Sequence, residues 1–153
     1  MAEKKVENTS DSAEVNEGED KQTAEFLFPL HDIGNAERFV KHHGEYIRFC
    51  PELKHWLINN NAHWEMQQSK TKLYLMVKKT IQSIHDEAKR EDLSNGQKQD
   101  LIKHATASSS KSRMSAMLDL ASMEESVQIS ARDFNSNPWQ INCANGTLNL
   151  QTK

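Results

Sequence analysis

Apolar residues recur at helical spacing along the middle of the sequence, and this pattern limits the possible folds more than any other feature. In the first stretch they follow at intervals of four, four, three and four, so they share one helix face: Leu73, Val77, Ile81, Ile84 and Ala88. We expect Ser69 to cap this helix. A second helix is predicted over residues 96–107, with these side chains buried: Leu101, Ile102 and Ala105. After the serine run 108–110, a third helix carries one apolar stripe: Met114, Met117, Leu118 and Ala121.

The segment before these helices indicates a further helix and short strands. Residues 32–35 are typical of a turn with Asn35 as the N-cap, and Gly44 stands where a helix C-cap is expected. A strand over residues 46–50 ends at Pro51. Residues 55–58 and 63–65 then form a predicted hairpin, because the asparagines at 59–61 tolerate positive φ.

The C-terminal segment favours a second hairpin. Ile141 and Cys143 alternate before Asn145-Gly146, and Leu148 and Leu150 alternate after it. Asn-Gly is the strongest short-range signal for a tight hairpin turn. The predicted fold is therefore α+β and mainly helical, with a helical hairpin core and two small antiparallel strand pairs.

Charge divides the chain into two parts. Residues 1–25 hold eight acidic side chains and three lysines, a net charge of −5, with almost no large aliphatic residues. Such a composition cannot offset the entropy of ordering, so we expect a disordered acidic arm. Residues 26–153 form one predicted domain with 16 basic and 14 acidic residues. This mildly basic balance permits nucleic-acid binding but does not require it.

The sequence predicts no catalytic, metal or cofactor site. It contains neither a GxxxxGK[ST] phosphate loop nor a GxGxxG motif. Two acid pairs, Asp86-Glu87 and Glu91-Asp92, lie among lysines and are typical of solvated helix faces. The only cluster of metal-ligand types is Cys50, His55 and His63, whose spacing matches no recognised zinc pattern. His43 is expected to be a packing histidine.

Cysteine usage and hydropathy indicate a location inside the cell. Cys50 and Cys143 lie far apart and form no paired motif, which favours reduced thiols in the cytoplasm. No apolar run approaches the roughly 18 residues of a membrane span, and the N-terminus resembles no secretory signal.

Aromatic and basic residues mix in the predicted strands, and two interpretations remain open. They could form a stacking platform for single-stranded nucleic acid. The favoured alternative is core packing, with Trp56 and Trp64 facing one another across the hairpin. The residues concerned are Tyr46, Arg48, Phe49, Lys54, Trp56 and Trp64.

The predicted helix–serine turn–helix over residues 96–123 is the candidate nucleic-acid contact. Two short helices joined by a polar turn resemble a helix-turn-helix arrangement, and the start of the second helix offers backbone N–H groups and the positive end of a dipole. An ordinary helical hairpin with a hydrated surface explains the same pattern equally well. The candidate contact residues are Lys98, Lys103, Lys111, Ser112, Arg113 and Ser115.

Four stretches in order resemble one family. They are residues 34–40, residues 46–52 with Trp56 and the step 63–65, residues 115–121, and residues 137–150. Together they resemble the domain that precedes the superfamily-3 helicase in phage and plasmid primases and in poxvirus primase–helicases. In such proteins an upstream primase or regulatory segment and a downstream hexameric helicase flank this domain. The resemblance implies a role in replicating a mobile element or virus.

The resemblance implies support for ring assembly or DNA contact rather than chemistry. The chain ends at Lys153, where the linker to the motor is expected, and it lacks the phosphate-binding loop of the helicase. We therefore expect a non-catalytic accessory domain whose partners are DNA and a helicase motor or other replication subunits, and oligomer formation is compatible with this. The alternative is a purely structural interaction module that does not bind DNA.

Overall fold

The computed structural model describes residues 25–61, 63–67, 70–134 and 151, with the strand backbone at 140–143 and 146–149. Its fold is α+β and mainly helical, as the sequence predicted. The elements in chain order are α1 (Asp32–His43), β1 (Ile47–Cys50), β2 (His55–Asn59), β3 (Trp64–Met66), α2 (Thr71–Glu87), α3 (Asn95–Ser108), α4 (Lys111–Ala121), the 3-10 helices η1 (Glu125–Val127) and η2 (Ala131–Asp133), β4 (Gln140–Cys143) and β5 (Gly146–Asn149). The predicted acidic arm, apart from Glu25, lies outside the described residues.

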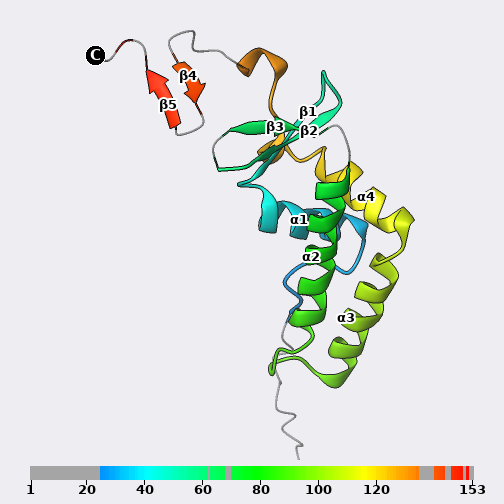
Figure 1. Ribbon diagram of the computed structural model, residues 1–153. Helices are drawn as coiled ribbons and strands as arrows, with labels where there is room; N and C mark the ends of the chain where they lie inside the picture. Colours follow the sequence, from blue (N-terminus) through cyan, green and yellow to red (C-terminus); the bar gives the residue numbers. More distant parts are fainter. Residues whose placement is uncertain are drawn as a thin grey trace, which may run out of the picture.

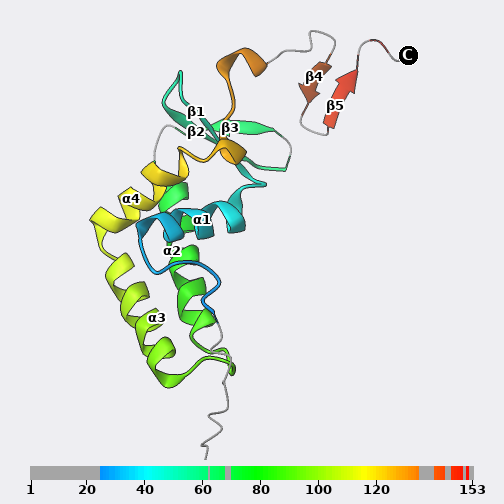
Figure 2. The ribbon, with the colours of Figure 1, turned by 180° about the vertical axis from the view of Figure 1, so that it is seen from behind.

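The helices enclose one core, and a small sheet lies at its end. Helices α2 and α3 run side by side in opposite directions, α1 packs across α2 and α4, and the sheet β1-β2-β3 covers the end where α1 and α4 finish (Figures 1 and 2). The apolar side chains that the sequence placed along one face of α2 are all buried, and so are those that it placed along one face of α4. Ile47 and Trp56 extend the same apolar cluster into the sheet.

Helix α3 differs from the prediction in one buried position. Ile102 was expected in the core, but 47% of it is exposed. The buried face of α3 continues from Leu101 through His104 and Ala105 to Ser108, at spacings of three, four and seven residues. Ile102 lies outside this buried face, and the polar residues His104 and Ser108, which the sequence analysis did not place in the core, are buried on it.

The helix starts also differ from the prediction. His31, not Asn35, is the N-cap of α1, and its Nδ1 accepts a hydrogen bond from the Gly34 amide at 3.1 Å. Asn35 is buried inside the helix. Helix α2 has Lys70 at its N-cap position, while Ser69 lies outside the described residues. Gly44 does end α1, but with right-handed φ and ψ of −57° and −24°.

The predicted hairpin of β2 and β3 is present, and β1 adds a third antiparallel strand. Asn61 in its connection has φ of 72°, the conformation that asparagine tolerates. The expected Trp56–Trp64 contact is wrong, because Trp64 is opposite Asn59 in the register. Trp56 instead packs in the core, with its ring 5.1 Å from that of Phe49.

The second predicted hairpin is also present. Strands β4 and β5 pair antiparallel, with Ile141 opposite Leu148 and Cys143 opposite Gly146. Ala144, Asn145 and Leu150 lie outside the described residues. The connection is short, as predicted, but Gly146 is opposite Cys143 and belongs to β5 rather than to the turn in which the sequence placed it.

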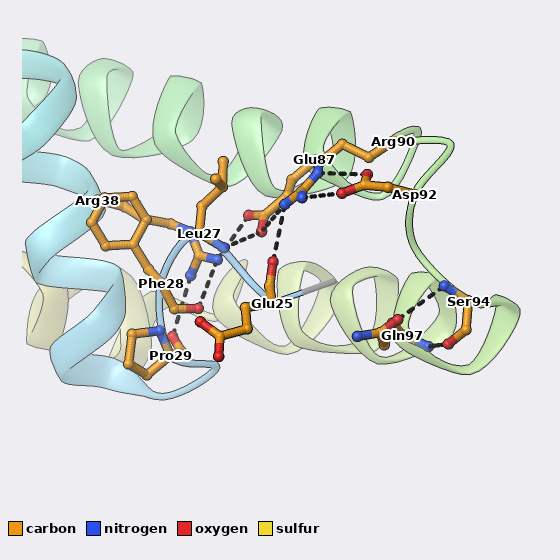
Figure 3. A network of polar contacts seen from close by, with 10 residues as sticks. All are labelled: Glu25, Leu27, Phe28, Pro29, Arg38, Glu87, Arg90, Asp92, Ser94 and Gln97. Atoms are coloured by element: carbon orange, nitrogen blue, oxygen red, sulfur yellow. Dashed lines mark hydrogen bonds and ion pairs between the residues drawn. The ribbon is translucent and has the colours of Figure 1, made fainter. Parts of the chain in front are cut away.

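A buried ion pair joins α1 to α2 (Figure 3). Arg38 Nη2 lies 2.9 Å from Glu87 Oε2, and the two side chains are only 2% and 3% exposed. The same guanidinium donates to the carbonyl oxygens of Phe28 and Pro29, while Glu87 Oε1 accepts from the Leu27 amide at 2.8 Å. The prediction that Glu87 is solvated is therefore wrong. The ion pair also binds backbone groups of the segment 25–31 and holds that segment against α1 and α2.

Glu87→Gln tests the contribution of this pair. The substitution leaves the buried Arg38 guanidinium without a counter-charge, so we expect the free energy of unfolding to fall by about 3–5 kcal/mol. Urea denaturation measures it. The matched control is Asp86→Asn, which breaks the exposed ion pair with Lys89 on the neighbouring position and should leave the midpoint nearly unchanged. Equal losses in the two variants would contradict a special role for Glu87.

Gly34→Ala tests the fit of the segment 25–31 against α1. A Cβ at this position would lie 2.1 Å from the Pro29 carbonyl oxygen, so the backbone of the segment must shift. Inside a helix alanine normally stabilises by about 1 kcal/mol relative to glycine. We expect the opposite sign, a lower melting temperature, measured by circular dichroism. A variant at least as stable as the wild type would show that the segment moves without cost.

Candidate nucleic-acid interface

A serine caps the start of each of the helices α3 and α4. Ser94 and Gln97 form a capping box at the start of α3, with Ser94 N donating to Gln97 Oε1 at 2.9 Å (Figure 3). Ser109 and Ser110 join the two helices, and Ser110 Oγ accepts from the Arg113 amide at 3.4 Å. The prediction of two helices separated by a serine turn is confirmed. The start of α4 therefore presents the positive end of an 11-residue helix dipole.

Helix α4 turns away from α3 at this corner. Its main packing partner is α1, and it makes few contacts with α3 (Figures 1 and 2). Met117 and Leu118 are fully buried on its inner face. The arrangement of α3 and α4 is therefore an open corner rather than a closely packed helical hairpin, which leaves the outer sides of both helices facing solvent.

The six candidate contact residues do not form one cluster. Lys103, Lys111 and Ser112 are exposed, and Arg113 and Ser115 are partly exposed beside them on α4. Lys98 lies near the other end of α3, about 15 Å from Ser108 at 1.5 Å per residue. There it contributes to lowering the pKa of Asp92, after the larger effect of the Arg90 hydrogen bond.

Acidic side chains compete for part of this surface. Arg113 Nε lies 3.9 Å from Asp32 Oδ1, a buried oxygen that accepts no hydrogen bond within the described residues. Ser115 Oγ donates to Asp119 Oδ2 at 3.4 Å. Lys103 and Lys111 take part in no ion pair among the residues that the structure describes. These two lysines are thus the best placed of the six to meet an anion.

Helix α2 adds polar side chains, one of them a lysine, that the sequence analysis did not assign to this site. A hollow of about 260 Å³ separates α2 from the corner, and its polar lining comes from Lys78, Gln82 and His85 on α2 and from Ser109. These three positions have the spacing i, i+4 and i+7, so they lie on one face of α2. Each follows a buried residue of that helix by one position. The sequence could place them on one helix face, but it could not show that this face borders the corner.

A buried polar network holds the corner against α1. Asn35 Nδ2 donates to Ser108 Oγ at 2.9 Å, and its Oδ1 accepts from His104 Nε2 at 2.8 Å. This arrangement requires a proton on Nε2 of His104. Burial lowers the pKa of His104, and the charges of Arg38 and Arg113 lower it further. The network uses Asn35, which the sequence suggested as a cap, to position the candidate interface.

The histidines and cysteine of the strand region have other partners. Cys50 Sγ donates to Glu52, and His63 Nε2 lies 3.7 Å from Glu65 Oε1. Across the described residues no group of three or more metal-ligand side chains gathers. His43 is a packing histidine as predicted, with Nε2 3.2 Å from both the Met76 carbonyl oxygen and Thr80 Oγ1.

The aromatic and basic residues of the candidate stacking platform lie partly in the core and partly at the surface. Phe49 and Trp56 pack against or within the core, which confirms the core interpretation for these two rings. Trp64 and Tyr46 remain 39% and 47% exposed, and Arg48 lies over the Trp64 ring at 5.2 Å. Two of the six residues therefore pack in or against the core, and the other four are partly or largely exposed.

Comparison with known proteins places the chain in a family. Residues 36–153 match the sequence model of the D5 N-terminal-like family, and the chain belongs to this family. The match is consistent with an N-terminal domain of primase–helicase proteins. No curated protein and no solved structure matches the chain. Within the described residues, no helix is both long and apolar enough to cross a membrane.

Three histidines, His104 in the corner network and His42 and His43 on α1, predict a pH-dependent stability. Burial lowers the pKa of His104, His42 and His43 below the usual 6.5, so the unfolded chain binds protons first as the pH falls. Stability should be constant above about pH 7 and should decrease below 6.5, until the folded-state pKa values are reached. His104→Gln keeps a donor for Asn35 and should reduce this decrease. Urea unfolding at pH 8 and 5.5 measures it; an unchanged pH dependence would exclude His104 as a contributor.

Proposed function

We propose that the protein is a non-catalytic accessory domain of a primase–helicase, acting in the DNA replication of a mobile element or virus. The family match over residues 36–153 carries this proposal. Its partners are DNA and a helicase motor or other replication subunits, and its site of action is the cytoplasm. No enzymatic step is assigned to the domain.

The α3–α4 corner is the proposed DNA contact. Lys103 and Lys111 are exposed, Arg113 adds a shared charge, and Lys78 and His85 border the hollow behind the turn. Cations beside a helix N-terminus are suited to bind phosphate oxygens. Contacts with phosphates position a protein on DNA but do not recognise the base sequence. With up to four such cations, and with Asp32 and Asp119 nearby, we expect moderate affinity with little sequence preference.

One observation favours an assembly role as the second candidate. Leu75 and Ile102 are large apolar side chains on the outer faces of α2 and α3, and they are 55% and 47% exposed. Apolar residues in such positions suit a contact with another protein surface. A packing contact of this kind would respond little to salt, whereas a phosphate contact weakens steeply as salt is raised.

Fluorescence anisotropy with labelled single-stranded and duplex oligonucleotides tests the DNA contact. The full chain should bind both, with log Kd changing with log salt by roughly 0.7–0.9 per phosphate neutralised. In the triple variant Lys103→Ala, Lys111→Ala, Arg113→Ala we expect the affinity to drop and the slope to fall by about two to three, because up to three phosphate contacts are removed.

The control variant removes the same total charge from other elements. It combines Lys41→Ala, Lys89→Ala and Arg132→Ala, all exposed positions on α1, the α2–α3 connection and η2. It should keep most of the affinity. Equal losses in both triple variants would mean that net charge alone governs binding, and no binding of the wild type at low salt would favour the assembly role.

A further inference from the structure

A second hollow lies beside the sheet, apart from the helical corner. Its volume is about 470 Å³, within the range typical of small-ligand sites. Its lining comes from all three strands of the sheet and from the segment after η1: Arg48, Leu57, His63, Trp64, Met66, Ile129, Asp133 and Phe134. Two aromatic rings, one guanidinium, one imidazole and one carboxylate therefore line the hollow.

The Arg48 side chain is held in a fixed position at this hollow. Its Nη1 donates to the carbonyl oxygens of Gly44 and Ile47, and its guanidinium carbon lies 5.2 Å from the centre of the Trp64 ring. Arg48 forms no ion pair with an acidic residue in the part of the chain that the structure describes. Since no carboxylate in the described part of the chain neutralises it, this oriented guanidinium can attract an external anion.

Trp64 is exposed although the same sheet buries another tryptophan. Trp56 is 5% exposed in the core, whereas Trp64 is 39% exposed and Met66 44% exposed on the edge strand β3. An indole on a three-residue edge strand contributes little to the core. The aromatic surface is instead presented together with a cation, the combination that proteins use to stack unpaired bases.

We propose that this hollow binds an unpaired base of single-stranded nucleic acid. The indole of Trp64 stacks on the base, and Arg48 attracts the adjoining phosphate. A base in a duplex is already stacked and paired, so the hollow selects single strands. This inference rests on the proposed function and deepens it, because the helical corner meets only the backbone that both forms share.

Charge decides in favour of nucleic acid over a peptide as the occupant. An unpaired arginine beside an exposed indole complements a base that carries a phosphate. Glu65, the nearest acid on β3, is already neutralised by Lys72, whose Nζ lies 2.9 Å from Glu65 Oε2. The carboxylate in the lining itself, Asp133, accepts a hydrogen bond from the Ser130 amide at 3.2 Å, which reduces its repulsion of a phosphate.

Anisotropy titrations with the full chain test the proposal. The probes are a labelled 12-nucleotide oligo(dT), the same backbone with abasic sites, and a duplex. Trp64→Leu should weaken oligo(dT) binding roughly 5- to 100-fold, the range expected for one lost stacking contact. Trp64→Tyr, which keeps an aromatic ring, should recover most of this loss. Duplex binding should not change, and the abasic strand should bind wild type and Trp64→Leu equally.

Met123→Ala is the matched control, since it removes an exposed apolar side chain that lines neither hollow. It should leave all three affinities unchanged. Circular dichroism verifies that each variant is folded. Unchanged oligo(dT) binding in folded Trp64→Leu would overturn the proposal and leave the hollow as a peptide-docking surface. Absence of any single-strand binding by the wild type would overturn it as well.

The two proposals fail in different ways. If the triple variant of the corner binds both nucleic acids more weakly while Trp64→Leu binds both as the wild type does, the proposed backbone contact is supported and the proposed base site is excluded. If Trp64→Leu loses only oligo(dT) while the corner variant keeps its affinity, the base site stands and the corner contact falls.

Discussion

The buried ion pair of Arg38 and Glu87 is the constraint on which the helical part depends. Burying two charges is costly unless each meets a partner and hydrogen bonds, and here the carbonyls of Phe28 and Pro29 and the Leu27 amide complete both sets. The pair fixes α1 against α2 and holds the segment 25–31 over their junction (Figure 3). With α1 fixed there, its first turn meets the α3–α4 corner and its last turn leads into the sheet.

The sequence predicted the elements better than their contacts. The apolar face of α2 and the existence of the C-terminal hairpin follow from short-range patterns, so both were predicted correctly, although Gly146 lies in β5 and not in the turn. The ion pair was missed because Arg38 and Glu87 are 49 residues apart, and an acid among lysines has the local pattern of a solvated face. Asn35 was assigned to a cap for the same reason, since only the tertiary structure reveals that Ser108 and His104 are its partners.

The candidate interfaces were predictable to different degrees. The serine caps and the basic residues after them identify the corner, but the sequence grouped Lys98 with residues from which α3 separates it. The contribution of Lys78 and His85 depends on which helix faces the corner, which is a tertiary fact. At the sheet, composition could not separate Trp56 from Trp64. The register decides, because it places one indole against the core and the other at an edge.

Helix α1 connects the two proposed contacts physically. Its first turn carries Asp32 and Asn35, which touch Arg113 and Ser108 of the corner. At its other end the Gly44 carbonyl accepts from Arg48, the arginine of the sheet hollow. A 12-residue helix is about 18 Å long, so a rigid spacer fixes the separation of the two surfaces. A strand bound at one surface would be presented to the other at high effective concentration, provided that the path between them is open. Two weak contacts of different chemistry would then act together on single strands, whereas a duplex would engage the corner alone.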